Sequence, residues 1–210
     1  MARLLYVESS PRKERSASIK VAQTFIDEYK KTHPQDRVDS IDLWNTTLPS
    51  FDGEAINAKY SILHGEKHSD SQRKAWGPVE KVIDNFRNAD KYVISIPMWN
   101  FGIPYTLKHY IDVLVQPGYT FSYSPDKGYT GLVTGKPAAV IYARGGAYAA
   151  GTGAEGFDYQ KTYVEHILRF IGFSDIESIL VEPMLMSTPE EKTKIIKAAQ
   201  DQARSIAARF

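Results

Sequence analysis

Short apolar runs alternate with longer amphipathic stretches along this chain. Leu4–Val7, Tyr92–Ile96 and Ala138–Tyr142 are almost wholly apolar, which is typical of strands buried on both faces of a parallel sheet. Val38–Leu43 and Ile176–Val181 mix apolar with charged positions and predict two more strands. Five strands are therefore expected.

Apolar residues at helical spacing fill the segments between these runs. They predict helices from 18 to about 31 and near 54–63, 73–88, 104–115 and 159–170, the last ending at Gly172. A final helix opens with Thr188-Pro189-Glu190-Glu191, a capping box with proline at its first position. Gly77-Pro78 is expected to interrupt the third helix and start a fresh turn. The glycine- and proline-rich stretch 116–136 predicts an excursion without a long helix.

This alternation of strands and helices is the pattern of a three-layer α/β domain. We expect one domain, residues 1–210, with a five-stranded parallel sheet in the strand order 2-1-3-4-5. In such sheets ligands bind beyond the carboxyl ends of the strands, where the winding direction switches between the first and third strands. The loops that follow strands are therefore the candidates for function.

Composition narrows the class of protein. Apolar residues make up 42% and charged residues 24% of the chain, as in ordinary globular proteins. The net charge of +1 gives no reason to expect a nucleic acid or a membrane as partner. Cysteine is absent, which excludes disulfides and a thiol nucleophile. No apolar run is long enough to span a membrane, and the one near residue 4 is too short for a signal peptide, so we expect a cytoplasmic protein.

The loop after the first strand has the chemistry of a phosphate site. Ser10, Ser16 and Ser18 supply hydroxyl groups at the start of a predicted helix, whose free N–H groups and dipole attract anions. Basic residues at positions 12, 13 and 15 raise the local potential. The same pattern also fits an ordinary capped helix behind a solvated run of charges. Because no G-x-G-x-x-G is present, a Rossmann dinucleotide site is not expected.

The loop after the third strand, Pro97-Met98-Trp99-Asn100-Phe101-Gly102-Ile103-Pro104, combines a stiff apolar rim with one amide. Two prolines stiffen the connection, and the aromatic rings with the amide of Asn100 match a flat ring that has one polar edge. The alternative is that these aromatic residues belong to the core or to a dimer surface.

The loop after the fourth strand is Ala143-Arg144-Gly145-Gly146-Ala147-Tyr148. Two adjacent glycines allow main-chain N–H groups to face a ligand without obstruction by side chains. Arg144 either adds positive charge or pairs with a carboxylate on the surface, and taken alone the motif also fits a plain strand-to-helix turn. A phosphate site, a flat-ring site and a glycine backbone at neighbouring strand ends together predict a pocket for FMN.

Other chemistries lack support in the sequence. Gly131–Lys136 is one residue too short for a P-loop, and Pro137 replaces the serine or threonine. His64 and His68 lie four residues apart without a third ligand nearby, so no metal site is expected. There is no G-x-S-x-G motif, so the sequence gives no support for a serine hydrolase. No catalytic side chain is predicted, because a bound flavin carries the chemistry itself.

On these motifs the chain resembles the FMN-dependent NADH azoreductases, a branch of the flavodoxin-like NAD(P)H:quinone oxidoreductases. The motifs are S-S-P…S-A-S at 9–18, P-M-W-N-F-G-I-P at 97–104, G-Y-T-F-S-Y at 118–123 and A-R-G-G at 143–146. The resemblance covers nearly the whole chain and implies a flavodoxin-like α/β/α fold. It also implies ping-pong transfer of two electrons from NADH or NADPH, through bound FMN, to quinones or aromatic azo compounds.

The resemblance assigns residues to each part of FMN. Around the phosphate it places Ser10, Ser16, Ala17 and Ser18. Along the ribityl chain and the ring it places Met98, Trp99, Asn100 and Phe101. At the pyrimidine edge it places Ala143, Arg144, Gly145 and Gly146. Trp99 stands where tyrosine is usual and Ala143 where a hydroxyl residue is frequent, so a shift in redox potential or substrate choice is expected.

Members of this family are homodimers whose pockets lie at the subunit boundary. The segment with Tyr119, Phe121 and Tyr123, which is hard to bury in one domain, suits that boundary and the rim of the substrate site. Two alternatives share the fold. A flavodoxin-type electron carrier would bind FMN but react only with protein partners, and such carriers are usually strongly acidic, unlike this chain. A cofactor-free regulatory or binding module is disfavoured by the presence of all three loops.

Overall fold

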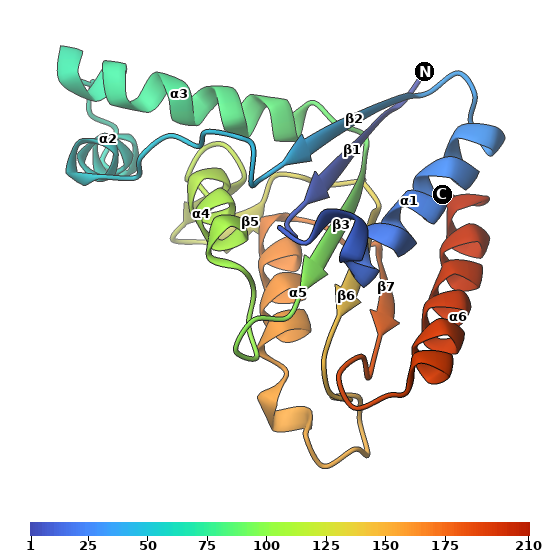
Figure 1. The fold of residues 1–210 in the computed structure, drawn as a ribbon. Helices are drawn as coiled ribbons and strands as arrows, with labels where there is room; N and C mark the ends of the chain where they lie inside the picture. The colour runs from blue at the N-terminus through green and yellow to red at the C-terminus, as the bar shows by residue number, and fades with distance from the viewer.

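Five parallel strands form the central sheet of the computed structural model, which describes residues 1–210 (Figure 1). They are β1 (Arg3–Glu8), β2 (Arg37–Asp42), β3 (Lys91–Pro97), β6 (Ala138–Ala143) and β7 (Ile176–Val181), in the order β2-β1-β3-β6-β7. Successive side chains of a strand point to opposite faces, so Leu4 and Tyr6 of β1 enter one core cluster while Leu5 and Val7 enter the other. The sheet therefore has a hydrophobic core on each side.

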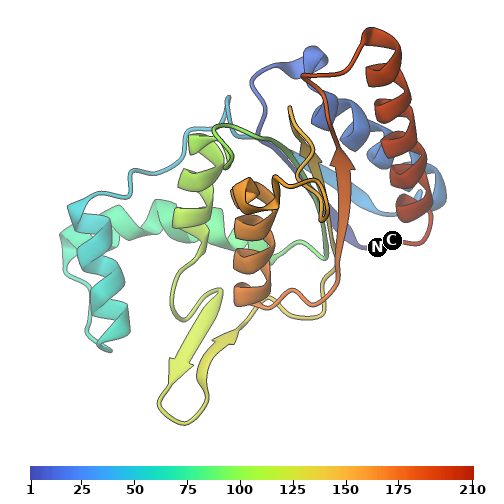
Figure 2. The ribbon, with the colours of Figure 1, turned by 90° about the horizontal axis from the view of Figure 1, so that it is seen from below.

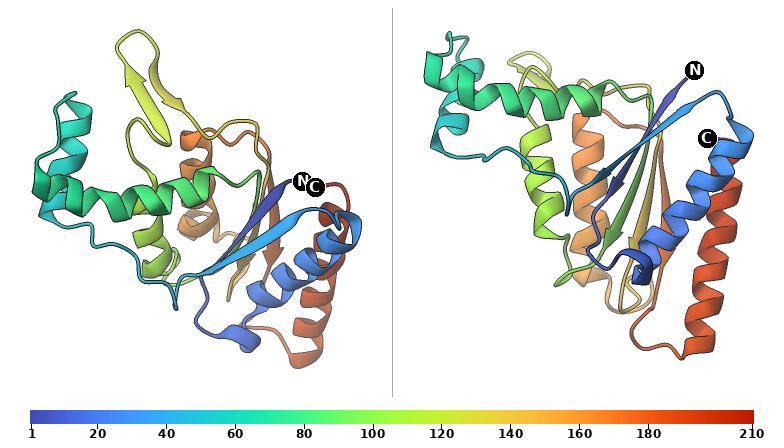
Figure 3. Two further views of the ribbon diagram at one scale, coloured as in Figure 1. Left: turned by 90° about the horizontal axis from the view of Figure 1, so that it is seen from above. Right: turned by 45° about the horizontal axis from the view of Figure 1, so that its top comes forward.

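Helices cover both faces of this sheet (Figure 1). One face carries α1 (Ala17–Thr32) and α6 (Pro189–Ala207). The other carries α3 (Asp70–Arg87), α4 (Tyr105–Leu114) and α5 (Tyr159–Ile171). A further helix, α2 (Gly53–Leu63), lies to the side of the sheet and packs across the beginning of α3 (Figure 3). The predicted flavodoxin-like α/β architecture with a five-stranded parallel sheet is confirmed.

A small antiparallel hairpin lies outside the main sheet and was not predicted. It consists of β4 (Phe121–Ser124) and β5 (Gly128–Gly131). Because these two strands intervene in the chain, the strand order is 2-1-3-6-7 instead of the predicted 2-1-3-4-5, although the five strands of the sheet are those expected. Each hairpin strand is only four residues long and rich in glycine and serine, so it carries little apolar periodicity. The hairpin projects from the end of the sheet opposite the arrowhead of β7 (Figure 2).

Gly77-Pro78 does not interrupt the third helix, so the expectation of a break there was wrong. α3 begins after a capping box formed by Ser69, earlier than predicted, and runs through this dipeptide without interruption. Proline at this position cannot donate the backbone hydrogen bond of its turn. The helix nevertheless continues because its apolar stripe, from Trp76 to Phe86, is buried on both sides of the dipeptide. The burial of this apolar stripe against the sheet outweighs the free-energy cost of the hydrogen bond that is missing at Pro78.

The two chain ends lie side by side, near the amino ends of the strands (Figure 2). Lys91, the first residue of β3, donates a hydrogen bond from Nζ to the carbonyl oxygen of Phe210 at 2.8 Å. The ring of Phe210 packs edge-on against Phe25 of α1, with the ring centroids 5.1 Å apart. None of the helices combines the length and the apolar character that crossing a membrane requires.

Candidate functional site

The carboxyl ends of β1, β3 and β6 meet around a cavity of about 450 Å³. Its predicted lining residues are Ser10, Ser16 and Ala17 from the first loop, Met98 and Trp99 from the second, and Ala143, Arg144 and Gly145 from the third. Small-molecule sites have volumes of about 300–1,000 Å³, so the cavity is large enough for a ligand. The other predicted cofactor residues do not line the cavity. Ser18, Asn100 and Gly146 each follow a lining residue directly in the chain, and Phe101 lies two positions after Trp99.

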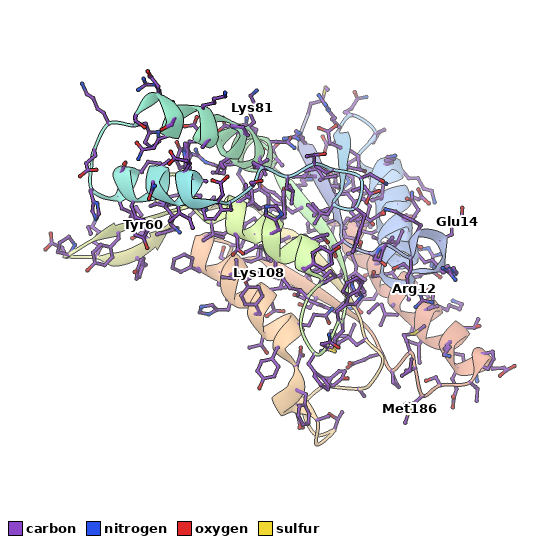
Figure 4. The ribbon with its side chains drawn as sticks, turned by 60° about the vertical axis from the view of Figure 1, so that its left-hand side comes forward. Arg12, Glu14, Tyr60, Lys81, Lys108 and Met186 are labelled. Atoms are coloured by element: carbon purple, nitrogen blue, oxygen red, sulfur yellow. The ribbon has the colours of Figure 1, made fainter.

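Sequence reasoning missed part of the cavity wall. The additional lining residues are Arg12, Arg15, Pro97, Met184, Leu185 and Lys192. Met184 and Leu185 follow β7, and their N–H groups donate to the carbonyl oxygens of Arg144 and Gly145, both at 2.9 Å. Ligands in such sheets bind beyond the carboxyl ends of the strands, and β7 is one of these strands. The same rule could therefore have predicted Met184 and Leu185 as lining residues. Figure 4 shows Arg12 and Met186 on the same side of the molecule, with Tyr60 at the far side.

The start of α1 presents unpaired donors to the cavity. Ser16 is the N-cap and its Oγ accepts from the N–H of Ile19 at 3.5 Å. The N–H groups of Ala17 and Ser18 donate to no acceptor within the protein. Together with the positive end of the helix dipole, these donors make the start of α1 suited to an anion.

Three cations line the cavity without forming ion pairs: Arg12, Arg15 and Lys192. Lys13 differs from the expectation, because its Nζ lies 2.6 Å from Glu8 Oε1 and also contacts Asp42. Burial would raise the pKa of Asp42, but hydrogen bonds from Lys13, from the N–H of Trp44 and from Asn45 bring that pKa below its ordinary value. Lys13 thus anchors the loop to β1 and β2, while its neighbours stay free for a ligand.

The loop after β3 contains a tight turn that separates two aromatic groups. Trp99 and Gly102 exchange two backbone hydrogen bonds, at 2.9 and 3.1 Å, and the residues between them, Asn100 and Phe101, have φ values of 47° and 67°. Positive φ is uncommon for asparagine and a real outlier for phenylalanine. Such strain is concentrated at functional sites. The turn sends Trp99 toward Trp44 and sends Phe101 to the opposite side.

Arg144, for which the sequence allowed either a free positive charge or a carboxylate partner on the surface, is buried and paired with two carboxylates. Its side chain is fully buried between Asp158, which contacts Nη1, and Glu182, whose Oε2 lies 2.9 Å from Nε. The ring of Tyr148 lies 5.6 Å from the guanidinium carbon. Asp158 caps α5 by accepting the N–H of Lys161 at 2.9 Å. Arg144 therefore connects the loop after β6 to α5 and to the loop after β7.

The two glycines of this loop have close side-chain neighbours. A Cβ atom on Gly145 would lie 3.3 Å from Cβ of Leu185, and one on Gly146 would lie 3.1 Å from the ring of Tyr148. Neither glycine N–H donates to an acceptor within the protein. The loop therefore offers free backbone donors beside the cavity, as the sequence suggested, and the glycines also allow the loop after β7 to approach.

The aromatic segment proposed for the substrate rim lies elsewhere in the single chain. The hydroxyl of Tyr119 donates to Glu80 at 2.5 Å, and the ring of Phe121 lies 5.0 Å from that of Phe170. Tyr123 is 61% exposed on the hairpin. None of these three residues lines the cavity. Their place at a subunit boundary stays a prediction.

Comparison with known proteins agrees with this geometry. The profile of a family described as having a flavodoxin-like fold matches residues 2–207. An FMN-dependent NADH:quinone oxidoreductase of Nitratidesulfovibrio vulgaris is 49% identical over 210 residues, which are 100% of both chains. One from Desulfotalea psychrophila is 47% identical over 207 residues, 99% of this chain and 97% of that protein.

Solved structures give the same result. A crystal structure of an azoreductase from Bacillus anthracis superposes with a TM-score of 0.90 at 32% identity, covering 100% of both chains. An FMN-dependent NADH-azoreductase from the same species, solved in complex with FMN, superposes with a TM-score of 0.88 at 26% identity and covers 100% of this chain and 99% of its own. The chain therefore belongs to the flavodoxin-like family that includes the FMN-dependent NADH:quinone oxidoreductases.

Proposed function

We propose that this protein is an FMN-dependent oxidoreductase that passes two electrons from NADH or NADPH to a quinone or an aromatic azo compound. The observation that carries the proposal is the cavity at the ends of β1, β3 and β6, which has free donors at two sides. The names of the relatives, and an azoreductase neighbour solved with FMN, support the same activity.

The residues present fit FMN in charge and in shape. The free N–H groups of Ala17 and Ser18, with the unpaired cations beside them, match a phosphate dianion. Met98 and Trp99 provide apolar wall for a flat ring. Beyond them, the N–H groups of the glycine loop match the oxygen- and nitrogen-bearing edge of that ring, and the buried Nη2 of Arg144 has no hydrogen-bond acceptor within the protein.

Bound FMN supplies the two-electron redox chemistry, and the chain's own residues bind and orient the reactants. The N–H groups of Gly145 and Gly146 would stabilise negative charge at the edge of a bound flavin ring, because fixed dipoles there need no reorganisation. Ala143 provides no hydroxyl donor at this edge, which leaves negative charge less stabilised than a serine would. Phe101, 44% exposed and close to the ring of Phe157, presents apolar surface on the loop after β3 against which a flat substrate can pack.

Colour and its loss upon reduction test this proposal. Purified protein is expected to be yellow, and NADH or NADPH in the absence of air is expected to bleach it without any added protein. A quinone should then restore the colour. Yellow protein that neither nicotinamide bleaches would instead indicate an electron carrier, and colourless protein that does not bind added FMN would indicate a binding module.

The proposal includes a single domain over residues 1–210, a homodimer and a cytoplasmic location, where NADH is available. Exposed aromatic residues support the homodimer. Tyr105, Phe157 and Tyr159 are 66%, 53% and 63% exposed, and Tyr123 and Tyr129 on the hairpin are 61% and 66% exposed. Clusters of exposed apolar side chains mark interaction surfaces.

A further inference from the structure

We propose that Lys192, from the last helix, is a residue of the cavity that recognises a phosphate monoester. Two ligands of the proposed reaction carry this group: FMN has it at the end of the ribityl chain, and NADPH has it on the adenosine ribose. Riboflavin and NADH lack it. The inference rests on the proposed function and deepens it, because it names the part of a ligand that this lysine recognises.

The charge of the cavity wall is one-sided. Four cationic residues line the cavity, and no acidic residue does. One of them, Arg144, is neutralised by its two carboxylate partners, so Arg12, Arg15 and Lys192 remain unpaired. The whole chain has 26 basic and 25 acidic residues, so composition does not explain this local excess. Unpaired like charges around one cavity repel one another, and a bound anion removes that repulsion.

The fold brings Lys192 to the loop after β1 from the far end of the chain. Lys192 is the fourth residue of α6, which packs beside α1 (Figure 1). Gln200 of α6 donates from Nε2 to Oγ1 of Thr24 in α1 at 3.0 Å. Both helices begin beyond the carboxyl ends of strands, α1 after β1 and α6 after β7. The cavity therefore receives donors from the start of α1 and a cation from the first residues of α6.

Interactions within α6 do not account for a lysine at this position. The start of a helix favours anionic side chains and disfavours cationic ones. The neighbouring acid, Glu191, does not neutralise Lys192, because its Oε2 accepts the N–H of Thr188 at 2.7 Å in the capping box. Lys192 is half-buried and lines the cavity, so its ammonium group is left for a ligand.

The chemistry of this arrangement matches a phosphate monoester better than a carboxylate. A phosphate monoester carries close to two negative charges at pH 7 and has three terminal oxygens, whereas a carboxylate carries one charge. The free N–H groups of Ala17 and Ser18 are directional donors without net charge. A lysine adds a compact charge with three donors on a flexible stem, which can follow one phosphate oxygen.

Lys192→Met tests this role, and Lys194→Met is the matched control, because Lys194 lies on the same helix but outside the cavity lining. Dissociation constants of FMN and riboflavin are measured by flavin fluorescence with the full chain after its flavin has been removed. KM values for NADPH and NADH are measured at saturating FMN with one quinone. Within each pair the two ligands differ only by the phosphate monoester, so the pairs distinguish its two sources.

Lys192→Met is expected to raise the constant for one phosphorylated ligand about five- to thirtyfold, the loss of one partly exposed charge-assisted hydrogen bond. A rise for FMN but not for riboflavin assigns Lys192 to the flavin phosphate. A rise for NADPH but not for NADH assigns it to the electron donor. Lys192→Arg should recover most of the affinity, and Lys194→Met should behave as wild type. Equal effects within each pair, or no effect in either pair, would overturn the inference.

The wild-type protein separates this inference from the proposed function. A wild-type chain that binds no FMN, or that neither nicotinamide bleaches, contradicts the proposed enzyme itself. Normal binding and bleaching of the wild type, with unchanged constants in Lys192→Met, contradict the role of Lys192 alone. Circular dichroism compares each variant with wild type. If Lys192→Met is misfolded, Lys192→Gln is tested in its place, with the same selectivity expected for the phosphorylated ligand.

Discussion

A single buried guanidinium joins three parts of the site. Arg144 is enclosed by Asp158 and Glu182, whose side chains are 12% and 8% exposed. Each carboxylate also accepts a backbone N–H, from Lys161 and Tyr148 respectively. Buried charges remain favourable only when such partners replace water. Arg144 therefore holds the glycine loop in place rather than serving mainly as a free positive charge.

Arg144→Met tests this role through stability. The substitution leaves two buried carboxylates without their cation, so the free energy of unfolding is expected to fall by about 3–5 kcal/mol in urea titrations of the FMN-free protein. Arg209→Met is the matched control, because Arg209 pairs with Glu177 at the surface and is 61% exposed. That control should change stability by less than about 1 kcal/mol. A comparably small loss in Arg144→Met would contradict the role assigned to Arg144.

Among the elements, α3 shows most clearly that burial can override local preference. Its Gly77-Pro78 dipeptide disfavours a helix, yet Trp76, Val79 and Ile83 are at most 1% exposed and keep the helix against the sheet. The helix therefore retains a local weakness that its packing tolerates. A substitution at Gly77 can therefore raise the stability of the helix.

Gly77→Ala is expected to stabilise the protein by about 0.5–1 kcal/mol. A Cβ at this position meets nothing within 4 Å, and alanine favours the helix more than glycine does. Gly128→Ala in the hairpin serves as the opposite control, because the φ of Gly128 is +66° and alanine is strained there. Thermal unfolding followed by circular dichroism compares the two. A lower melting temperature for Gly77→Ala would show that glycine is needed for the path of α3.

Local pattern was enough to predict the strands and most helices. The buried strands are apolar runs, and the loops of the site follow them directly, so the strand-end rule located the cavity. The hairpin was missed because its strands are short and polar. The partners of Arg144 could not be predicted either, since Asp158 and Glu182 lie 14 and 38 positions further along the chain and meet only in the folded state. Trp44 is a similar case, since only packing brings it to Trp99.

At the scale of the whole molecule, exposed aromatic residues occur both at the cavity, where Tyr105 contacts the lining residue Trp99, and on the distant hairpin. A homodimer in which the hairpin of one subunit reaches the cavity of the other would cover both groups. Sedimentation velocity is expected to give twice the mass of one chain at micromolar concentration. Tyr123→Ser combined with Tyr129→Ser should weaken that assembly, because both tyrosines are more than half exposed on the hairpin. A wild-type protein that sediments as a single chain would rule the homodimer out.

The adjacency of the two chain ends has a practical consequence. Both ends lie at the amino ends of the strands, whereas the cavity lies at the carboxyl ends (Figure 2). A tag or tether attached at either end would therefore fix the protein to a surface with the redox pocket directed outward, toward solution. Immobilisation on an electrode or a bead through the chain ends should leave dyes and quinones free access to the flavin.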